Sequence, residues 1–178
     1  MIIGISGLAG CGKSTVAKYL VEQYAFTEIS FAAILKDMLS VAGFPEPADR
    51  DDKEKIIDGF NFSWRHAAQC LGSEYGRVCL DKDIWIKLTM RKLKEGKNYV
   101  FSDVRFDNEA EAIINKGGFN IQLVGRKVDL GSSASHASEA GISSSLITQV
   151  IDNNGTIEDL KFKVNAAISS HLMVNYDD

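Results

Sequence analysis

Cysteine is scarce in the sequence and shows no pairing pattern. The 178 residues include three cysteines, Cys11, Cys70 and Cys79, and no C-x-x-C pair. An odd number of cysteines argues against a disulfide framework, and the missing pair argues against a zinc site. No cluster of His, Cys and Asp residues has the spacing of metal ligands either. We therefore expect free thiols in a reducing compartment.

Excess positive charge and long apolar runs are absent as well. The sequence has 20 Lys and Arg residues against 24 Asp and Glu residues, a net charge of −4. The protein therefore has no excess of positive charge that would attract nucleic acid, and any anion must bind at a local site. No apolar stretch approaches the roughly 20 residues that a membrane-spanning helix needs, and the N-terminal MIIGISGLAG has no basic residue. We expect a cytoplasmic protein that binds neither nucleic acid nor membranes.

Proline is rare too, and both prolines stand where the character of the chain changes. Pro45 and Pro47 precede the charge-rich ADRDDKEK and the aromatic FNFSW. We interpret residues 45–97, approximately, as a mostly helical insertion. Outside it, short apolar segments alternate with amphipathic ones, which predicts a mainly parallel sheet wrapped by helices on both faces. Residues 126–145, approximately, are rich in Ser, Gly and Ala and predict a small lid within a single α/β domain.

The strongest motif present is the run GLAGCGKS at residues 7–14, which fits G-x-x-x-x-G-K-S/T, the phosphate-binding loop. Glycines let backbone N–H groups turn inward around a phosphate, and the helix that follows offers its positive end. Lys13 would reach the β- and γ-phosphates, and the Ser14 hydroxyl would be a magnesium ligand. A chance glycine-rich turn is the alternative, but the run follows an apolar strand directly and opens an amphipathic helix. The motif predicts a nucleoside triphosphate site.

The rest of the chain has to select the reaction. A GTPase would show an N-K-x-D element, and the nearest sequence, DNNG at residues 152–155, does not match it. Motor ATPases are usually larger than this chain. A short chain with one insertion and one small lid favours a kinase that closes over a small acceptor.

Polar side chains follow the strand predicted at Tyr99–Phe101. Asp103 is a candidate to hold magnesium through water or to accept the acceptor's proton. Arg105 is a candidate to bind the acceptor's phosphate with two hydrogen bonds. Sites in open parallel sheets lie at this end of the strands. The alternative is a structural Asp–Arg pair.

The insertion contains a second group of candidates. Arg65 and Gln69 are four residues apart and so share a face of a predicted helix. An arginine suits a phosphate and an amide suits a base edge, so the pair suits a nucleotide acceptor; Arg77 lies farther along. A solvated helix face is the alternative. Trp64 and Trp85 are predicted to be core or wall residues.

Basic residues open the predicted lid. Arg126 and Lys127 are candidates to neutralise the transferring phosphoryl group, with basic residues at a strand end as the alternative. His136 and Glu139 lie in the same segment, and the sequence assigns them no role.

Together these segments resemble a known family. GLAGCGKST, SWRHAAQCLGSEYGR followed by DIWI, FSDVRFDNEAEAI, SHASE and VIDNNGTIEDL are similar, in this order, to segments of bacteriophage-type deoxynucleoside monophosphate kinases. The resemblance implies ATP-dependent phosphorylation of deoxynucleoside monophosphates to diphosphates, in the host cytoplasm if a phage encodes the chain. It also implies an adenylate-kinase-like P-loop fold, a three-layer α/β/α arrangement with a five-stranded parallel sheet.

The motif and the end of the strand assign ATP and Mg²⁺ to Gly7, Ala9, Gly10, Cys11, Gly12, Lys13, Ser14, Thr15 and Asp103. The resemblance adds Asn153 and its neighbours, which would lie near the donor base. It also implies that Arg65, Gln69 and Arg105 face the acceptor nucleotide and that Arg126 and Lys127 are lid cations. Arg77 stays a further candidate for the acceptor from its place along the predicted helix.

Two other functions stay open at this point. One is another small-molecule kinase of the same fold, such as a dephospho-coenzyme A kinase, and the other is a non-catalytic ATP-dependent binding module. The sequence also leaves open the accepted bases, the discrimination between deoxyribose and ribose, and whether the chain forms a homodimer.

Overall fold

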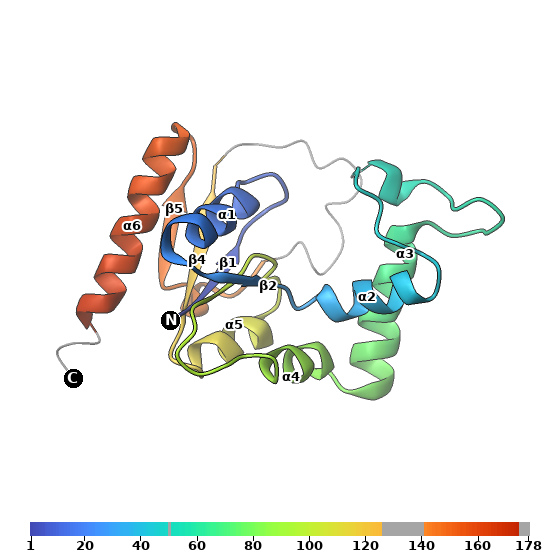
Figure 1. Ribbon diagram of the computed structural model, residues 1–178. Helices are drawn as coiled ribbons and strands as arrows, with labels where there is room; N and C mark the ends of the chain where they lie inside the picture. The colour runs from blue at the N-terminus through green and yellow to red at the C-terminus, as the bar shows by residue number, and fades with distance from the viewer. Residues whose placement is uncertain (50, 126–140, 175–178) are drawn as a thin grey trace. The chain divides into compact units, whose positions relative to one another are not determined.

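The computed structural model describes residues 1–49, 51–125 and 141–174. The chain divides into two compact units, Met1–Ile29 with Lys94–Asp178 as the first and Ser30–Leu93 as the second. Figure 1 shows the elements of both. Within the described part of the chain, no helix is both long and apolar enough to cross a membrane.

The first unit contains the sheet and the helices that cover it. Its elements are β1 (Ile2–Ser6), α1 (Lys13–Tyr24), β2 (Thr27–Ile29), β3 (Tyr99–Phe101), α5 (Asp107–Ile114), β4 (Phe119–Val124), the 3-10 turn η5 (Ser144–Leu146), β5 (Gln149–Asp152) and α6 (Ile157–Val174). The sheet formed by the described residues has five strands in the order β2-β3-β1-β4-β5, and every neighbouring pair is parallel. The predicted five-stranded parallel sheet is confirmed.

Helices cover both faces of this sheet, as predicted. Ile5 of β1 belongs to the same buried cluster as Leu20 of α1 and Val164 of α6. Its neighbour Gly4 faces the opposite way, because side-chain positions alternate along a strand. A Cβ atom on Gly4 would lie 2.7 Å from the Ile113 side chain of α5. Helices α1 and α6 therefore share one face, and α5 covers the other.

Helices α1 and α6 each have an apolar face, and most of its residues are buried. Three apolar residues are more exposed: Val21 at 37%, Tyr24 at 39% and Ile157 at 52%. Val21 and Tyr24 lie in the last turn of α1, and Ile157 is the first residue of α6, where a helix has fewer neighbours to cover it. The buried members are Val16, Ala17, Leu20, Leu160, Val164 and Ile168.

The second unit is helical and has a core of its own. It contains α2 (Ala33–Val41), the 3-10 turn η1 (Asp51–Glu54), α3 (Trp64–Gln69), the π-helix η2 (Cys70–Leu80) and α4 (Ile84–Met90). Trp64 and Trp85 are buried in one cluster with Leu35 and Leu39, so their predicted core role is confirmed.

The π-helix η2 continues α3 without a break (Figure 1). It packs closely on the Trp85 side chain of α4. Trp85 Nε1 donates to the Gly72 carbonyl oxygen at 2.7 Å. A Cβ atom on Gly76 would lie 2.4 Å from the Trp85 ring, so only glycine allows this approach. The sequence did not predict this helix type, because no residue pattern distinguishes a π-helix from an α-helix here.

Candidate active site

The phosphate-binding loop joins the central strand β1 to α1. Gly7, Gly10 and Gly12 have φ angles of 133°, 78° and 105°, a region that favours glycine. The loop ends at the N-terminus of α1, a helix of 12 residues whose peptide dipoles place partial positive charge there. This arrangement of backbone and helix is suited to an anion.

Lys13 adds a full positive charge to this loop. Its Nζ atom donates to the carbonyl oxygens of Gly7 at 2.7 Å and Leu8 at 2.8 Å, so the side chain folds back over the loop. Ser14 and Thr15 follow in the first turn of α1, and both are exposed. The structure therefore brings the predicted loop residues, the lysine and the two hydroxyl side chains into one site.

Asn153 joins this site from the far end of the sequence. It directly follows β5 and is 2% exposed. Its Nδ2 atom donates to the Cys11 carbonyl oxygen at 2.9 Å, so Asn153 contacts the loop backbone. Sequence reasoning did not find this contact, because a pair of residues 142 positions apart leaves no local pattern.

Asp103 and Arg105 follow β3, which is paired directly with β1. Gly4 pairs with Phe101, the last residue of β3, so Asp103 comes two residues beyond this pair along the chain, as Ser6 does on β1. The Asp103 carboxylate thus belongs to the edge of the sheet at which the phosphate-binding loop begins. The backbone N–H of Arg105 donates to Glu109 Oε2 at 2.8 Å, which fixes the turn into α5.

Glu28 is an acidic residue at this edge that the sequence analysis missed. It lies on β2, and its Oε1 atom accepts a hydrogen bond from Ser102 Oγ at 2.5 Å. Ser102 precedes Asp103, so the contact ties the end of β3 to β2. Only the strand pairing could have indicated it.

The predicted acceptor residues Arg65 and Gln69 lie on α3 in the second unit. Ser63 caps this helix by accepting a hydrogen bond from the His66 N–H at 3.2 Å. Arg65 Nε forms an ion pair with Glu54, although the pair lacks hydrogen-bond geometry. Glu54 is therefore a neighbour of Arg65 that the sequence did not indicate.

Arg77 lies farther along, on the π-helix η2. Its Nη1 atom donates to the Lys82 carbonyl oxygen at a long 3.4 Å. Near the start of η2, burial and the neighbouring Glu74 raise the pKa of the Cys70 thiol. A raised pKa disfavours the thiolate, so cysteine nucleophilic chemistry is not favoured at Cys70.

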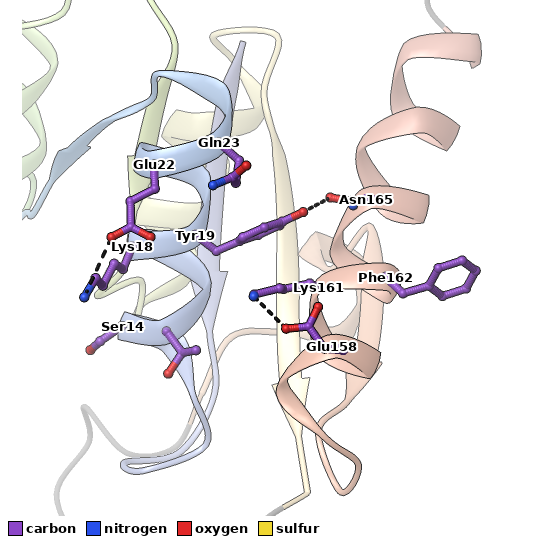
Figure 2. Close-up of a pocket in the computed structure, with 10 residues that line it drawn as sticks. Ser14, Lys18, Tyr19, Glu22, Gln23, Glu158, Lys161, Phe162 and Asn165 are labelled. Carbon is purple, nitrogen blue, oxygen red and sulfur yellow. Dashed lines mark hydrogen bonds and ion pairs between the residues drawn. The ribbon is translucent and has the colours of Figure 1, made fainter.

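A cavity of about 830 Å³ lies between α1 and α6 and begins at Ser14 and Thr15 (Figure 2). Tyr19 Oη donates to Asn165 Oδ1 at 2.9 Å across it. Figure 2 shows the Phe162 ring pointing away from α1. The remaining charged side chains pair along their own helices, Lys18 with Glu22 and Lys161 with Glu158.

The lid candidates Arg126 and Lys127 lie outside the described residues. The same holds for His136 and Glu139. Their roles stay predictions.

Comparison with known proteins identifies the family. The family model described as deoxynucleotide monophosphate kinase matches residues 51–164. This chain belongs to the deoxynucleotide monophosphate kinase family. The enzyme is therefore a phosphotransferase that acts on small-molecule nucleotides.

Two curated relatives match this chain over nearly their whole length. A protein of Acanthamoeba polyphaga mimivirus, provisionally named a deoxynucleotide monophosphate kinase, is 29% identical over 194 residues, covering 98% of this kinase and 100% of the relative. A "UPF0200 protein" from Aeropyrum pernix is 23% identical over 190 residues, covering 94% of this chain and 91% of its own length.

A solved structure supports the fold alone. TT1252 from Thermus thermophilus is 19% identical to this kinase and has a TM-score of 0.52, over 96% of this chain and 97% of its own. The parallel sheet, its helices on both faces and the loop after β1 are those of a P-loop NTPase-like α/β fold.

Proposed function

We propose that this kinase transfers the γ-phosphoryl group of Mg-ATP to a deoxynucleoside monophosphate. An oxygen of the acceptor's phosphate attacks the γ-phosphorus, and the bond from that phosphorus to the bridging β–γ oxygen breaks. The products are a deoxynucleoside diphosphate and ADP. The observation that carries the proposal is the glycine loop after β1 with Lys13 Nζ folded over it, in a chain of this family.

The loop and its helix are assigned to the donor. The backbone N–H groups of residues 7–12 would bind the β- and γ-phosphates. Lys13 would stabilise the negative charge that develops on these phosphates during transfer. The Ser14 and Thr15 side chains, both exposed at the start of α1, would bind the phosphates and their cation. The loop after β5, beside Asn153, would lie near the donor base.

Magnesium is assigned to Ser14 and Asp103. Hydroxyl and carboxylate oxygens are the hard ligands that Mg²⁺ prefers, so this donor set fits the ion. The pairing of β3 with β1 supports the assignment, because both residues belong to segments at the same edge of the sheet. When bound, the ion neutralises charge on the β- and γ-phosphates.

The acceptor is assigned to Arg65, Gln69, Arg77 and Arg105. An arginine can bind a phosphate through two parallel hydrogen bonds, which fixes the phosphate's direction as well as its place. Arg65 and Gln69 share a face of α3, which suits one ligand with a phosphate and a base. A phosphate would replace the Glu54 carboxylate as the partner of Arg65.

The chain is proposed to work as one P-loop kinase domain with an acceptor-binding insertion and a lid at residues 126–145. Arg126 and Lys127 would supply lid charge to the transferring group. Little covalent chemistry is required of the protein, because positioning and charge stabilisation carry most of phosphoryl transfer.

A coupled assay of ADP release tests this function. Mg-ATP is offered with dAMP, dCMP, dGMP, dTMP, the matching ribonucleotides and dephospho-coenzyme A. Strong stimulation by at least one deoxynucleoside monophosphate is expected. Stimulation by dephospho-coenzyme A alone would replace the acceptor, and ATP binding without stimulation by any acceptor would indicate a binding module.

A further inference from the structure

The side chain of Asn153 is held in one orientation beneath the phosphate-binding loop. It is 2% exposed, and its Nδ2 atom donates to the Cys11 carbonyl oxygen at 2.9 Å. Only the amide nitrogen can face a carbonyl oxygen, because two oxygens would repel each other. Asn153 Oδ1 accordingly points away and has no hydrogen-bond partner in the described part of the chain.

The backbone of Asn153 anchors this side chain to the sheet. Its N–H donates to the Val124 carbonyl oxygen at 2.8 Å, which extends the pairing of β5 with β4. The carboxamide also occupies the space beside Gly12, where a Cβ atom would lie 2.5 Å from Nδ2. Gly12 is therefore required both by its φ of 105° and by the presence of Asn153.

The contact determines the direction of one peptide group in the loop. In a trans peptide the C=O and the following N–H point in opposite directions. The Cys11 carbonyl oxygen points toward the buried Asn153, so the Gly12 N–H of the same peptide points to the other side of the loop. If this peptide turned over, a carbonyl oxygen would face the phosphates in place of a donor, and like charges would repel.

We propose that Asn153 is a positioning residue for the donor phosphates. It holds the peptide between Cys11 and Gly12 so that the Gly12 N–H serves the phosphate site, and it does so through the loop backbone rather than by contact with the donor base. This inference rests on the part of the proposed function that assigns the loop to ATP.

The test uses a nearly isosteric substitution, Asn153→Asp. The carboxylate keeps the size of the side chain but offers no N–H to the Cys11 oxygen and repels it. We expect the Kd for Mg-ATP and Mg-ADP, measured by calorimetry, to rise by roughly ten-fold or more, the equivalent of about 1.4 kcal/mol. The KM for the acceptor should change by less than about two-fold. A general loss of structure would instead change both the Kd for Mg-ATP and the acceptor KM.

Asn120→Asp is the matched control. Asn120 is the other fully buried carboxamide of the described first unit, 0% exposed, and it donates to the carbonyl oxygens of Ala110 at 3.1 Å and Leu146 at 3.0 Å. It lies on the α5 face and contacts no residue of the loop among its described hydrogen bonds. Its substitution should lower the Tm at least as much as Asn153→Asp and leave the Kd for Mg-ATP unchanged. If Asn153→Asp does not fold, Asn153→Ala takes its place in the experiment. This variant adds no charge and should also raise the Kd for Mg-ATP.

Two results would overturn the proposal: a wild-type Kd for Mg-ATP in folded Asn153→Asp, or an equal loss of ATP binding in Asn120→Asp. Turnover of deoxynucleoside monophosphates is measured in parallel. Wild-type protein that binds Mg-ATP but forms no deoxynucleoside diphosphate would contradict the proposed function, and the ratio of Kd values between the variants would still decide the role of Asn153.

Discussion

The charge of Lys13 is the residue-scale feature on which the account depends most. Its ammonium group lies over the loop and donates hydrogen bonds to the carbonyl oxygens of Gly7 and Leu8. A phosphate oxygen of the bound donor could accept these hydrogen bonds instead. Backbone N–H groups bind phosphate in the ground state as well, whereas a cation near the β–γ bridge gains most as charge develops in the transition state.

Lys13→Ala should therefore lower kcat by roughly 100-fold or more. The measurement is ADP release at saturating ATP and acceptor. Lys18→Ala is the matched control, since Lys18 lies on the same helix but is 76% exposed and paired with Glu22. The account fails at this residue if the two alanine variants lose activity equally.

Arg65 should act on the acceptor rather than on the donor. Arg65→Ala should raise the acceptor KM by roughly ten-fold or more and leave the KM for ATP nearly unchanged, because a bidentate phosphate contact is lost. Steady-state kinetics with each substrate varied in turn measures both values. Arg91→Ala, at an exposed arginine of the same unit, is the control. An unchanged acceptor KM in Arg65→Ala would show that the assignment is wrong.

At the scale of elements, the start of α6 is held by a reciprocal cap. Thr156 Oγ1 accepts from the Asp159 N–H at 3.1 Å, and Asp159 Oδ2 accepts from the Thr156 N–H at 2.9 Å. Thr156 therefore caps this helix through its side chain. The cap follows Asn153 by three residues, so it also fixes the segment that reaches the phosphate-binding loop.

This cap gives the protein a predictable response to acid. Hydrogen bonds from the Thr156 side chain and backbone lower the pKa of Asp159. A lowered pKa in the folded state stabilises the protein above the ordinary Asp value of about 4, and that contribution disappears as the pH falls through the lowered value. The Tm of wild type should exceed that of Asp159→Asn at pH 6, and the difference should shrink toward pH 3. Thermal unfolding across this range measures it, and a difference independent of pH would contradict the prediction.

At the scale of the whole molecule, the sequence predicted the repeating features and missed the long-range ones. The strands and helices of the first unit were predictable because apolar residues recur with the period of each element, as at Val16, Leu20 and Val164. The loop was predictable because its glycines and Lys13 fall within one short run, residues 7–14, at the spacing of a known motif. The contact of Asn153 with Cys11 and the pairing of Glu28 with Ser102 join distant segments, and no local spacing encodes such contacts.

The two units carry different parts of the proposed reaction. The first holds the loop, Lys13 and Asp103, and the second holds Arg65, Gln69 and Arg77. With a net charge of −4, the protein has no general attraction for anions, so we expect both nucleotides to bind through local groups such as Lys13 and Arg65. In the proposed reaction the γ-phosphoryl group of ATP passes to the acceptor nucleotide and not to water.

Phosphorus NMR of the products shows whether the phosphoryl group is transferred to the nucleotide or to water. The enzyme is incubated with Mg-ATP and the deoxynucleoside monophosphate that stimulates ADP release most strongly. The β-phosphate signal of a deoxynucleoside diphosphate should grow in step with ADP, and no inorganic phosphate should accumulate. ADP accompanied by inorganic phosphate, with the monophosphate unchanged, would show hydrolysis without transfer and would contradict the account.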